Sequence, residues 1–164
     1  MKNLVMKLLI LTSLLTLVAG CSAHKESDEN VKTIQTFLNN EFTGPDDELS
    51  AAFKQDGAFP PELNEYVDEN YEPLVMDWED MMNKNYILFY QRMAFEYGYL
   101  MKPTNIEIIK DSDLAYDCRV DVEYSKNGEP STATVAARIN LNEDGKIVSI
   151  RNMDVGGLLE KLNQ

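Results

Sequence analysis

The chain has 164 residues, and its 28 acidic against 15 basic residues give a formal net charge of −13 at pH 7. Such an acidic surface argues against binding nucleic acid, whose phosphates require positive charge, and against docking on anionic lipid headgroups. A hydrophobic content of 44% predicts a folded chain, and the length suits one domain with a sizeable core.

The N-terminus has the composition of an export signal. Lys2 and Lys7 precede an apolar run over residues 8–19, and small residues follow it. A basic start, an apolar run and small residues before a cleavage site are typical of a secretory signal. Polar residues interrupt the run, which falls short of the roughly 20 apolar residues that span a bilayer. The sequence therefore predicts an exported protein.

The apolar run ends at positions 17–21 in the pentapeptide LVAGC. This pentapeptide resembles the lipobox of bacterial lipoprotein signal peptides. The resemblance implies cleavage between Gly20 and Cys21, and a diacylglycerol joined to Cys21 through a thioether. It places the mature protein on the extracytoplasmic face of the cell membrane, held by its lipid. A retained signal anchor, or an ordinary signal with a chance cysteine, remains open as an alternative.

The sequence divides into three parts: a lipoprotein signal peptide at 1–20, a lipidated cysteine and tether at 21–30, and a single domain at 31–164. Residues 22–28 are polar and give the tether a reach of at most about 25 Å. His24, the chain's one histidine, lies in this tether. We expect His24 to be a solvated linker residue. The alternative is that it senses pH near the membrane surface.

Helical spacing of apolar residues predicts four helices in the first half of the domain. Ser27 is the expected N-cap of the first helix, and Pro45 suits the first position of the second. Residues 85–100 fit either a buried helix or an irregular segment. The four predicted helices cover about 27–43, 45–56, 61–72 and 74–82.

Tyrosines gather in the middle of the chain, where six of the eight lie between Tyr66 and Tyr99. An aromatic ring offers an apolar face and a polar edge, so such a stretch can line a pocket for a sugar or an aromatic ligand. The alternative is a core whose hydroxyl groups reach solvent. The candidate ligand-binding residues are Trp78, Tyr86, Tyr90 and Tyr97.

From Thr104 onward, apolar residues recur at every second position, which is typical of half-buried strands. Asn127-Gly128 is a hairpin signal between the second and third strands. A short C-terminal helix is expected around Leu158. The four predicted strands cover about 104–110, 114–124, 133–141 and 146–153.

Helices followed by an antiparallel meander predict an α+β fold, with the helices covering one face of a curved sheet of about four strands. Over residues 31–162 this pattern resembles the cystatin-like, nuclear-transport-factor-like cone fold. The chain is also similar to small envelope lipoproteins of Gram-positive bacteria. The helical block at 61–100 exceeds what the minimal fold needs, so we expect it to cover the mouth of the cone.

The sequence offers no catalytic constellation. With Cys21 lipidated, Cys118 stands alone among alternating apolar residues, which predicts a buried and inert thiol. There is no Cys-x-x-Cys, no histidine pair and no phosphate loop, and the acidic turns at 111–113 and 142–145 lack the EF-hand pattern. We therefore expect no metal site and no cofactor.

Related cone folds can place an aspartate and a tyrosine in one apolar pocket for proton transfer. Here the alternation puts Asp117 and Asp121 on the strand face opposite Tyr116, with Arg119 between them. Because a guanidinium lowers the pKa of a nearby carboxyl group, this arrangement suits a solvated strand face better than a general base.

The sequence thus predicts a non-catalytic, membrane-anchored binding module of the cell envelope. Its partner would be an envelope protein, a wall polymer or a peptide, and a homodimer through the sheet stays open. The alternative is a small-molecule binder or isomerase-like enzyme with a pocket lined by Trp78, Tyr86, Tyr90 and Tyr97.

Overall fold

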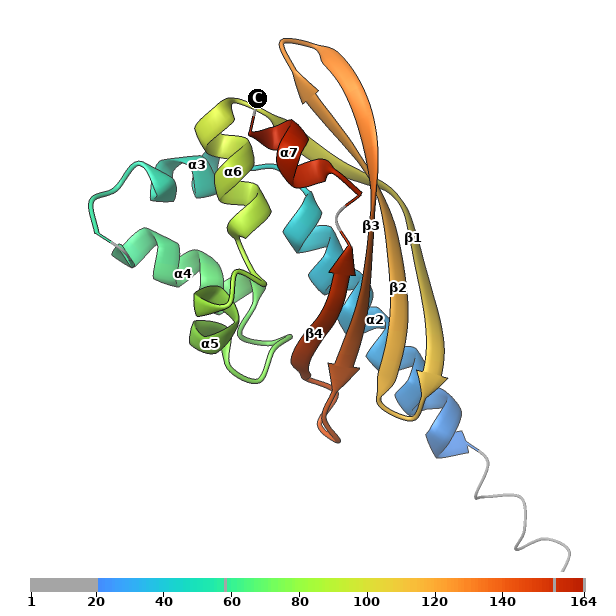
Figure 1. Ribbon diagram of the computed structural model, residues 1–164. Coiled ribbons are helices and arrows are strands. Elements are labelled where there is room, and N and C mark those ends of the chain that lie inside the picture. Colours follow the sequence, from blue (N-terminus) through green and yellow to red (C-terminus); the bar gives the residue numbers. More distant parts are fainter. Residues whose placement is uncertain (1–20, 58, 155, 164) are drawn as a thin grey trace, which may run out of the picture.

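The computed structural model describes residues 21–57, 59–154 and 156–163, and the signal peptide predicted at 1–20 lies outside this range (Figure 1). Helices precede an open antiparallel sheet, which confirms the predicted α+β class. Among the described residues, no helix has the length and apolar character required to cross a membrane.

The sheet is a four-stranded meander in the order β1-β2-β3-β4. Asn127 and Gly128 join β2 to β3 with positive φ angles of 55° and 83°, as the Asn-Gly hairpin signal predicts. The strands are β1 (Leu100–Ser112), β2 (Ala115–Lys126), β3 (Glu129–Leu141) and β4 (Ile147–Asp154).

One face of the sheet is buried and the other faces solvent. On β2, Tyr116 and Val120 are buried, whereas Asp117 and Arg119 point to the exposed face. Arg138 on β3 forms ion pairs on that face with Asp117 and with the end of β1. The alternation follows the period of two in the sequence, so the predicted solvated position of Asp117 is confirmed.

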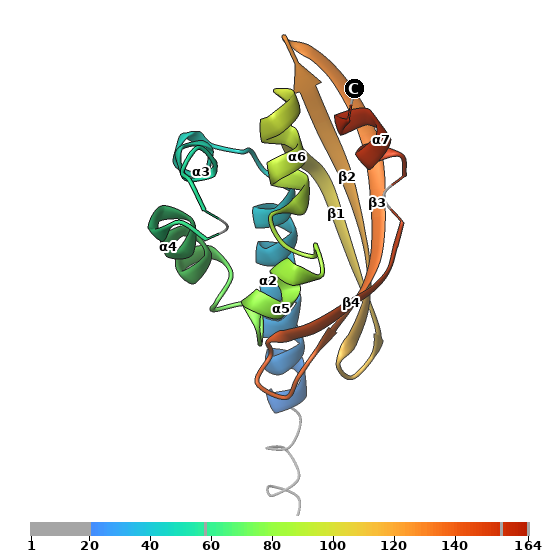
Figure 2. The ribbon, with the colours of Figure 1, turned by 60° about the vertical axis from the view of Figure 1, so that its left-hand side comes forward.

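The helices form two layers on the buried face (Figures 1 and 2). α2, α5 and α6 lie next to the sheet, and α3 and α4 lie outside them. One continuous cluster of buried side chains from both helices and strands fills the core. The helices are α2 (Cys21–Phe42), α3 (Asp47–Phe53), α4 (Pro61–Asn70), α5 (Trp78–Asn83), α6 (Phe89–Tyr97) and α7 (Leu158–Leu162).

Three helix starts differ from the predictions, the first two of them at α2 and α3. α2 begins at Cys21, so Ser27 lies inside the helix instead of capping it, and the polar stretch 22–28 is helical. Pro45 precedes the second helix, because the side chain of Asp46 accepts a hydrogen bond from the N–H of Leu49 at 2.8 Å. A carboxylate that satisfies a free N–H is a stronger N-terminal signal than proline.

The helix predicted at 74–82 begins only at Trp78. The N–H of Met76 donates to the carbonyl of Ile147, and the N–H of Ile147 donates to the carbonyl of Leu74, both at 2.9 Å. These bonds hold the residues before α5 in a parallel bridge to β4. Pairing with the sheet edge therefore replaces the first turn of the predicted helix.

Candidate functional site

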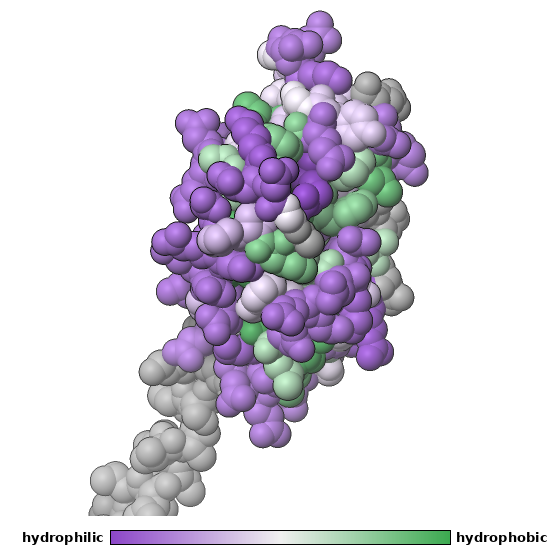
Figure 3. Space-filling model, turned by 90° about the vertical axis from the view of Figure 1, so that its left-hand side faces the viewer, coloured by the Kyte–Doolittle hydropathy of each residue, from purple (hydrophilic) through white to green (hydrophobic). Residues whose placement is uncertain are grey.

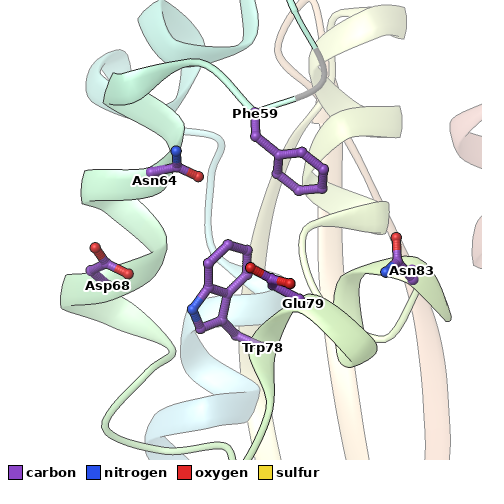
Figure 4. Close-up of a pocket in the computed structure, with 6 residues that line it drawn as sticks. All are labelled: Phe59, Asn64, Asp68, Trp78, Glu79 and Asn83. Atoms are coloured by element: carbon purple, nitrogen blue, oxygen red, sulfur yellow. The ribbon is translucent and has the colours of Figure 1, made fainter.

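A cleft of about 460 Å³ opens between α4 and α5 on the outer side of the helical layer (Figure 4). Asn64 and Asp68 lie four residues apart on α4, so both project from the same side of that helix. Glu79 and Asn83 are related in the same way on α5. The lining residues are Phe59, Asn64, Asp68, Trp78, Glu79 and Asn83.

Two aromatic rings form the apolar part of the cleft. The ring centroids of Phe59 and Trp78 lie 6.2 Å apart, with an interplanar angle of 60°. Phe59 is 44% exposed and Trp78 is half-buried, so both rings present free surface. Figure 4 shows Asn64 and Asp68 facing these rings from α4. The cleft therefore pairs exposed aromatic surface with amide and carboxylate groups.

The four polar side chains of the cleft, Asn64, Asp68, Glu79 and Asn83, make no hydrogen bond or ion pair with any other described residue. Side chains at surface turns and helix ends commonly bond to the backbone nearby, as Asp46 and Asp77 do here. The cleft's polar groups instead keep their bonding capacity for solvent or a ligand.

The chain around the cleft is strongly acidic. Residues 55–83 contain nine acidic residues and no lysine, arginine or histidine. The basic residue that follows, Lys84, pairs with Asp80 at 2.6 Å. Figure 3 shows this face of the molecule, where hydrophilic side chains surround patches of apolar surface. The segment that forms the cleft therefore carries nine of the 28 acidic residues and no positive charge.

Of the four predicted ligand-binding residues, the structure places Trp78 alone in this cleft. Tyr90 is buried, its ring packs against Phe42 and its hydroxyl donates to Sδ of Met153 at 3.5 Å. Burial raises the pKa of Tyr90 to about 12. Tyr86 and the fourth candidate, Tyr97, are half-buried and lie outside the cleft lining.

Sequence reasoning did not single out the other five cleft residues. The tyrosine-rich stretch drew attention to aromatic residues, whereas Phe59 stands alone between a glycine turn and two prolines. The available signal was electrostatic: no basic residue interrupts residues 55–83. An acidic stretch without a basic residue, beside an isolated aromatic residue, was therefore the signal that the sequence offered for this cleft.

Glu41 is a second unexpected feature, because its side chain is 1% exposed within the apolar core. Its carboxylate oxygen Oε2 accepts hydrogen bonds from the N–H of Leu88 at 3.0 Å and from the hydroxyl of Tyr71 at 3.2 Å. Burial raises the pKa of Glu41 to about 8, although hydrogen bonds from Leu88, Tyr71 and the backbone of Tyr90 act to lower it. The group is therefore a neutral or weakly ionised buried acid near pH 7.

Gln91 on α6 is fully buried in the same polar cluster. Its Nε2 donates to the carbonyl of Asn40, whereas its Oε1 has no hydrogen-bond partner among the described residues. Burial is the main cause that raises the pKa of Tyr71 well above its usual value. The hydrogen bonds of Glu41, Tyr71 and Gln91 thus link α2, the residue that ends α4, and α6 inside the core. Enclosed in this way, the cluster serves packing and helix capping.

Cys118 is buried at 5% exposure, as predicted, and burial raises the pKa of its thiol to about 12. Asp121 lies on the outer sheet face, where the hydroxyl of Thr134 donates to it at 2.7 Å. That hydrogen bond is the main cause that lowers the pKa of Asp121, with Arg119 contributing less. In the described ranges no group of three or more His, Cys, Asp or Glu residues could hold a metal ion.

Comparison with known proteins leaves the site to be argued from its own geometry. No family model matches the sequence, and neither a curated protein nor a solved structure matches it.

Proposed function

We propose that the protein is a lipoprotein anchored through Cys21 to the extracytoplasmic face of the cell membrane, where it acts as a non-catalytic binding module. The binding site of this module is the cleft between α4 and α5. The observation that carries the binding role is the set of exposed aromatic and unpaired polar side chains in that cleft.

The anchor rests on the pentapeptide at positions 17–21, and the fold is compatible with it. Cys21 is the first residue of α2, a 22-residue helix about 33 Å long. The β1–β2 and β3–β4 turns lie at the same end of the molecule as Cys21, and the β2–β3 hairpin lies at the other end (Figure 1). An anchor at Cys21 would therefore leave α4 and α5 accessible at the side of the domain.

The anchor is tested by metabolic labelling with an alkyne-bearing fatty acid, followed by fractionation of the cells. We expect the full chain to carry the label and to sediment with membranes. The Cys21→Ala variant should lose the label, whereas Cys118→Ala, which changes the chain's other cysteine, should keep it. Label retained in Cys21→Ala would contradict the lipidation.

The binding role is tested by placing a photoreactive amino acid at Asn64 in the cleft and, as a control, at Glu107 on the exposed sheet face. Both variants are irradiated in living cells. We expect a discrete crosslinked species from position 64, and none of the same mass from position 107. Identical crosslinking from both positions, or none from position 64, would contradict a binding site in the cleft.

A further inference from the structure

We infer that the cleft between α4 and α5 binds the cationic side chain of a lysine or arginine in a basic peptide segment of a partner protein. This inference names the ligand of the site proposed above and so rests on that proposed function.

The first support is the aromatic pair. An ammonium or guanidinium group is attracted to the face of an aromatic ring within about 6 Å of the centroid, and tryptophan is the strongest partner. Trp78 and Phe59 have ring centroids 6.2 Å apart and line the same cleft, so a cationic group in the cleft can lie within reach of both rings. The aliphatic stem of lysine or arginine can lie along such a surface while its charged end reaches further.

The second support is uncompensated charge. Asp68 and Glu79 line the same cleft from opposite helices, and neither has an ion-pair partner in the described part of the chain. Elsewhere in the molecule, acidic side chains near a base do pair, as Asp111 and Asp117 do with Arg138. Two free carboxylates beside two aromatic rings favour a cationic group over a neutral sugar, because a neutral sugar would form no ion pair with either carboxylate.

The third support points to a peptide instead of a small amine. Glu62, Glu65 and Glu69 are all exposed and lie on the neighbouring flank of α4, turned by roughly 110° about the helix axis from Asn64 and Asp68. They recur every three or four residues, which corresponds to about 4.5–6 Å along a helix. Alternate side chains of an extended peptide recur about every 6.8 Å. A segment with several basic residues can therefore place one side chain in the cleft and others against this acidic flank, whereas a single amine fills only the cleft.

The protein contains one tryptophan, so the intrinsic fluorescence of Trp78 reports directly on the cleft. We would titrate the full chain in a non-ionic detergent with acetylated, amidated hexalysine. We expect a saturable change in emission and an affinity that falls as salt is added, because ion pairs are screened. Spermidine and a neutral hexasaccharide of N-acetylglucosamine serve as comparison ligands, and we expect both to bind more weakly.

The decisive variants are matched in charge. Asp68→Asn with Glu79→Gln should raise the Kd for hexalysine by roughly tenfold, about 1.4 kcal/mol. Glu107→Gln with Asp113→Asn removes the same charge from exposed positions on β1 and its turn, and should change the Kd by less than about twofold. Phe59→Ala should weaken binding severalfold while its salt dependence stays, since no charge is removed.

Equal weakening by both double variants would overturn the inference, because binding would then reflect only the overall acidity of the protein. Spermidine binding as tightly as hexalysine would overturn the peptide assignment. A response to the hexasaccharide but not to hexalysine would overturn the cationic ligand and leave the cleft as a binding site. If none of the three ligands changes the fluorescence of Trp78 but position 64 still crosslinks, the inference about the ligand is wrong and the proposed binding role stands. If no ligand changes the fluorescence and position 64 does not crosslink, the proposed binding role is wrong as well.

Discussion

The backbone N–H of Leu88 donates a hydrogen bond to Oε2 of Glu41 at 3.0 Å, so a carboxyl group at the end of α2 caps the start of α6. Leu88 is the N-cap residue of α6, has a positive φ of 59° and offers no capping side chain of its own. A free N–H at a buried helix start is costly, and a carboxyl group from another helix satisfies it here. Helix packing and helix capping are thereby joined in one contact.

The first prediction concerns the stability of Glu41→Gln as a function of pH. Because the folded pKa of Glu41 is about 8 and the usual value is 4.5, the folded state binds more protons between these values. The contribution of Glu41 to stability is therefore complete below pH 4.5 and is lost as the pH rises toward 8. The glutamine variant should lack this loss, which can reach about 1.4 kcal/mol per pH unit.

Urea unfolding of both proteins at several pH values between 5 and 8 measures the effect. The variant should gain stability relative to the parent as the pH rises. Glu107→Gln removes a carboxyl group from the exposed sheet face, and its stability at pH 7 should stay within about 0.5 kcal/mol of the parent. A constant difference between Glu41→Gln and the parent across the range would argue against a protonated Glu41.

The second prediction concerns Tyr71, whose hydroxyl donates to Oε2 of Glu41 at 3.2 Å. Tyr71→Phe should lower the free energy of unfolding by about 1–2 kcal/mol, because a buried acceptor loses one of its hydrogen-bond donors. In a double-mutant cycle with Glu41→Gln, the two effects should not add, since both residues share one hydrogen bond. Tyr97→Phe removes a hydroxyl without a partner in the described structure and should have little effect.

The fold could be predicted because its signals are local. Alternation on β2 and the Asn-Gly pair before β3 define a strand and its hairpin without reference to distant residues. The apolar spacing of Ile34, Phe37 and Phe42 likewise marks the buried side of α2. Helix starts were predicted less well where a tertiary contact intervenes, as at the bridge between Val75 and Ile147.

The site could not be predicted in the same way, because its parts come together only through helix packing. Phe59 precedes α4 and Trp78 begins α5, and nothing in 19 residues of sequence shows that their rings lie 6.2 Å apart. Glu41 was recognisable in part, since it lies one turn beyond Phe37 on an otherwise apolar side of α2. Its partner Leu88 is 47 residues away, so the capping role required the structure.

The third prediction compares two glycines with positive φ. Gly156 has φ +52°, and a Cβ there would meet the carbonyl oxygen of Thr134 at a separation that no side chain tolerates. Gly98 has φ +75° but open space around it. Gly98→Ala should lower the free energy of unfolding by about 1 kcal/mol, from backbone strain alone. Gly156→Ala should lower the free energy of unfolding by clearly more, because β3 or the segment leading to α7 must also move.

Thermal unfolding of both variants measures the difference. A Tm for Gly156→Ala below that of Gly98→Ala by several degrees is the expected result. Equal melting temperatures would show that the segment before α7 is free to shift away from β3.

The fourth prediction concerns the thiol of Cys118, which is buried and whose pKa burial raises to about 12. The thiolate is the reactive form, so the folded protein should react with a maleimide-type or disulfide reagent only when the core opens. In a Cys21→Ala chain Cys118 is the remaining cysteine, which makes the reading unambiguous. We expect labelling in native buffer to be roughly a hundredfold slower than in 8 M urea.

An exposed thiol provides the matched control. Ser112 is exposed at the end of β1, so Ser112→Cys in a chain that also carries Cys21→Ala and Cys118→Ala should react rapidly in both conditions. A slow native rate for Cys118 alone would then be due to burial and not to the reagent or the detergent. Comparable rates at the two positions in native buffer would mean that β2 opens readily and that solvent often reaches the buried face of the sheet.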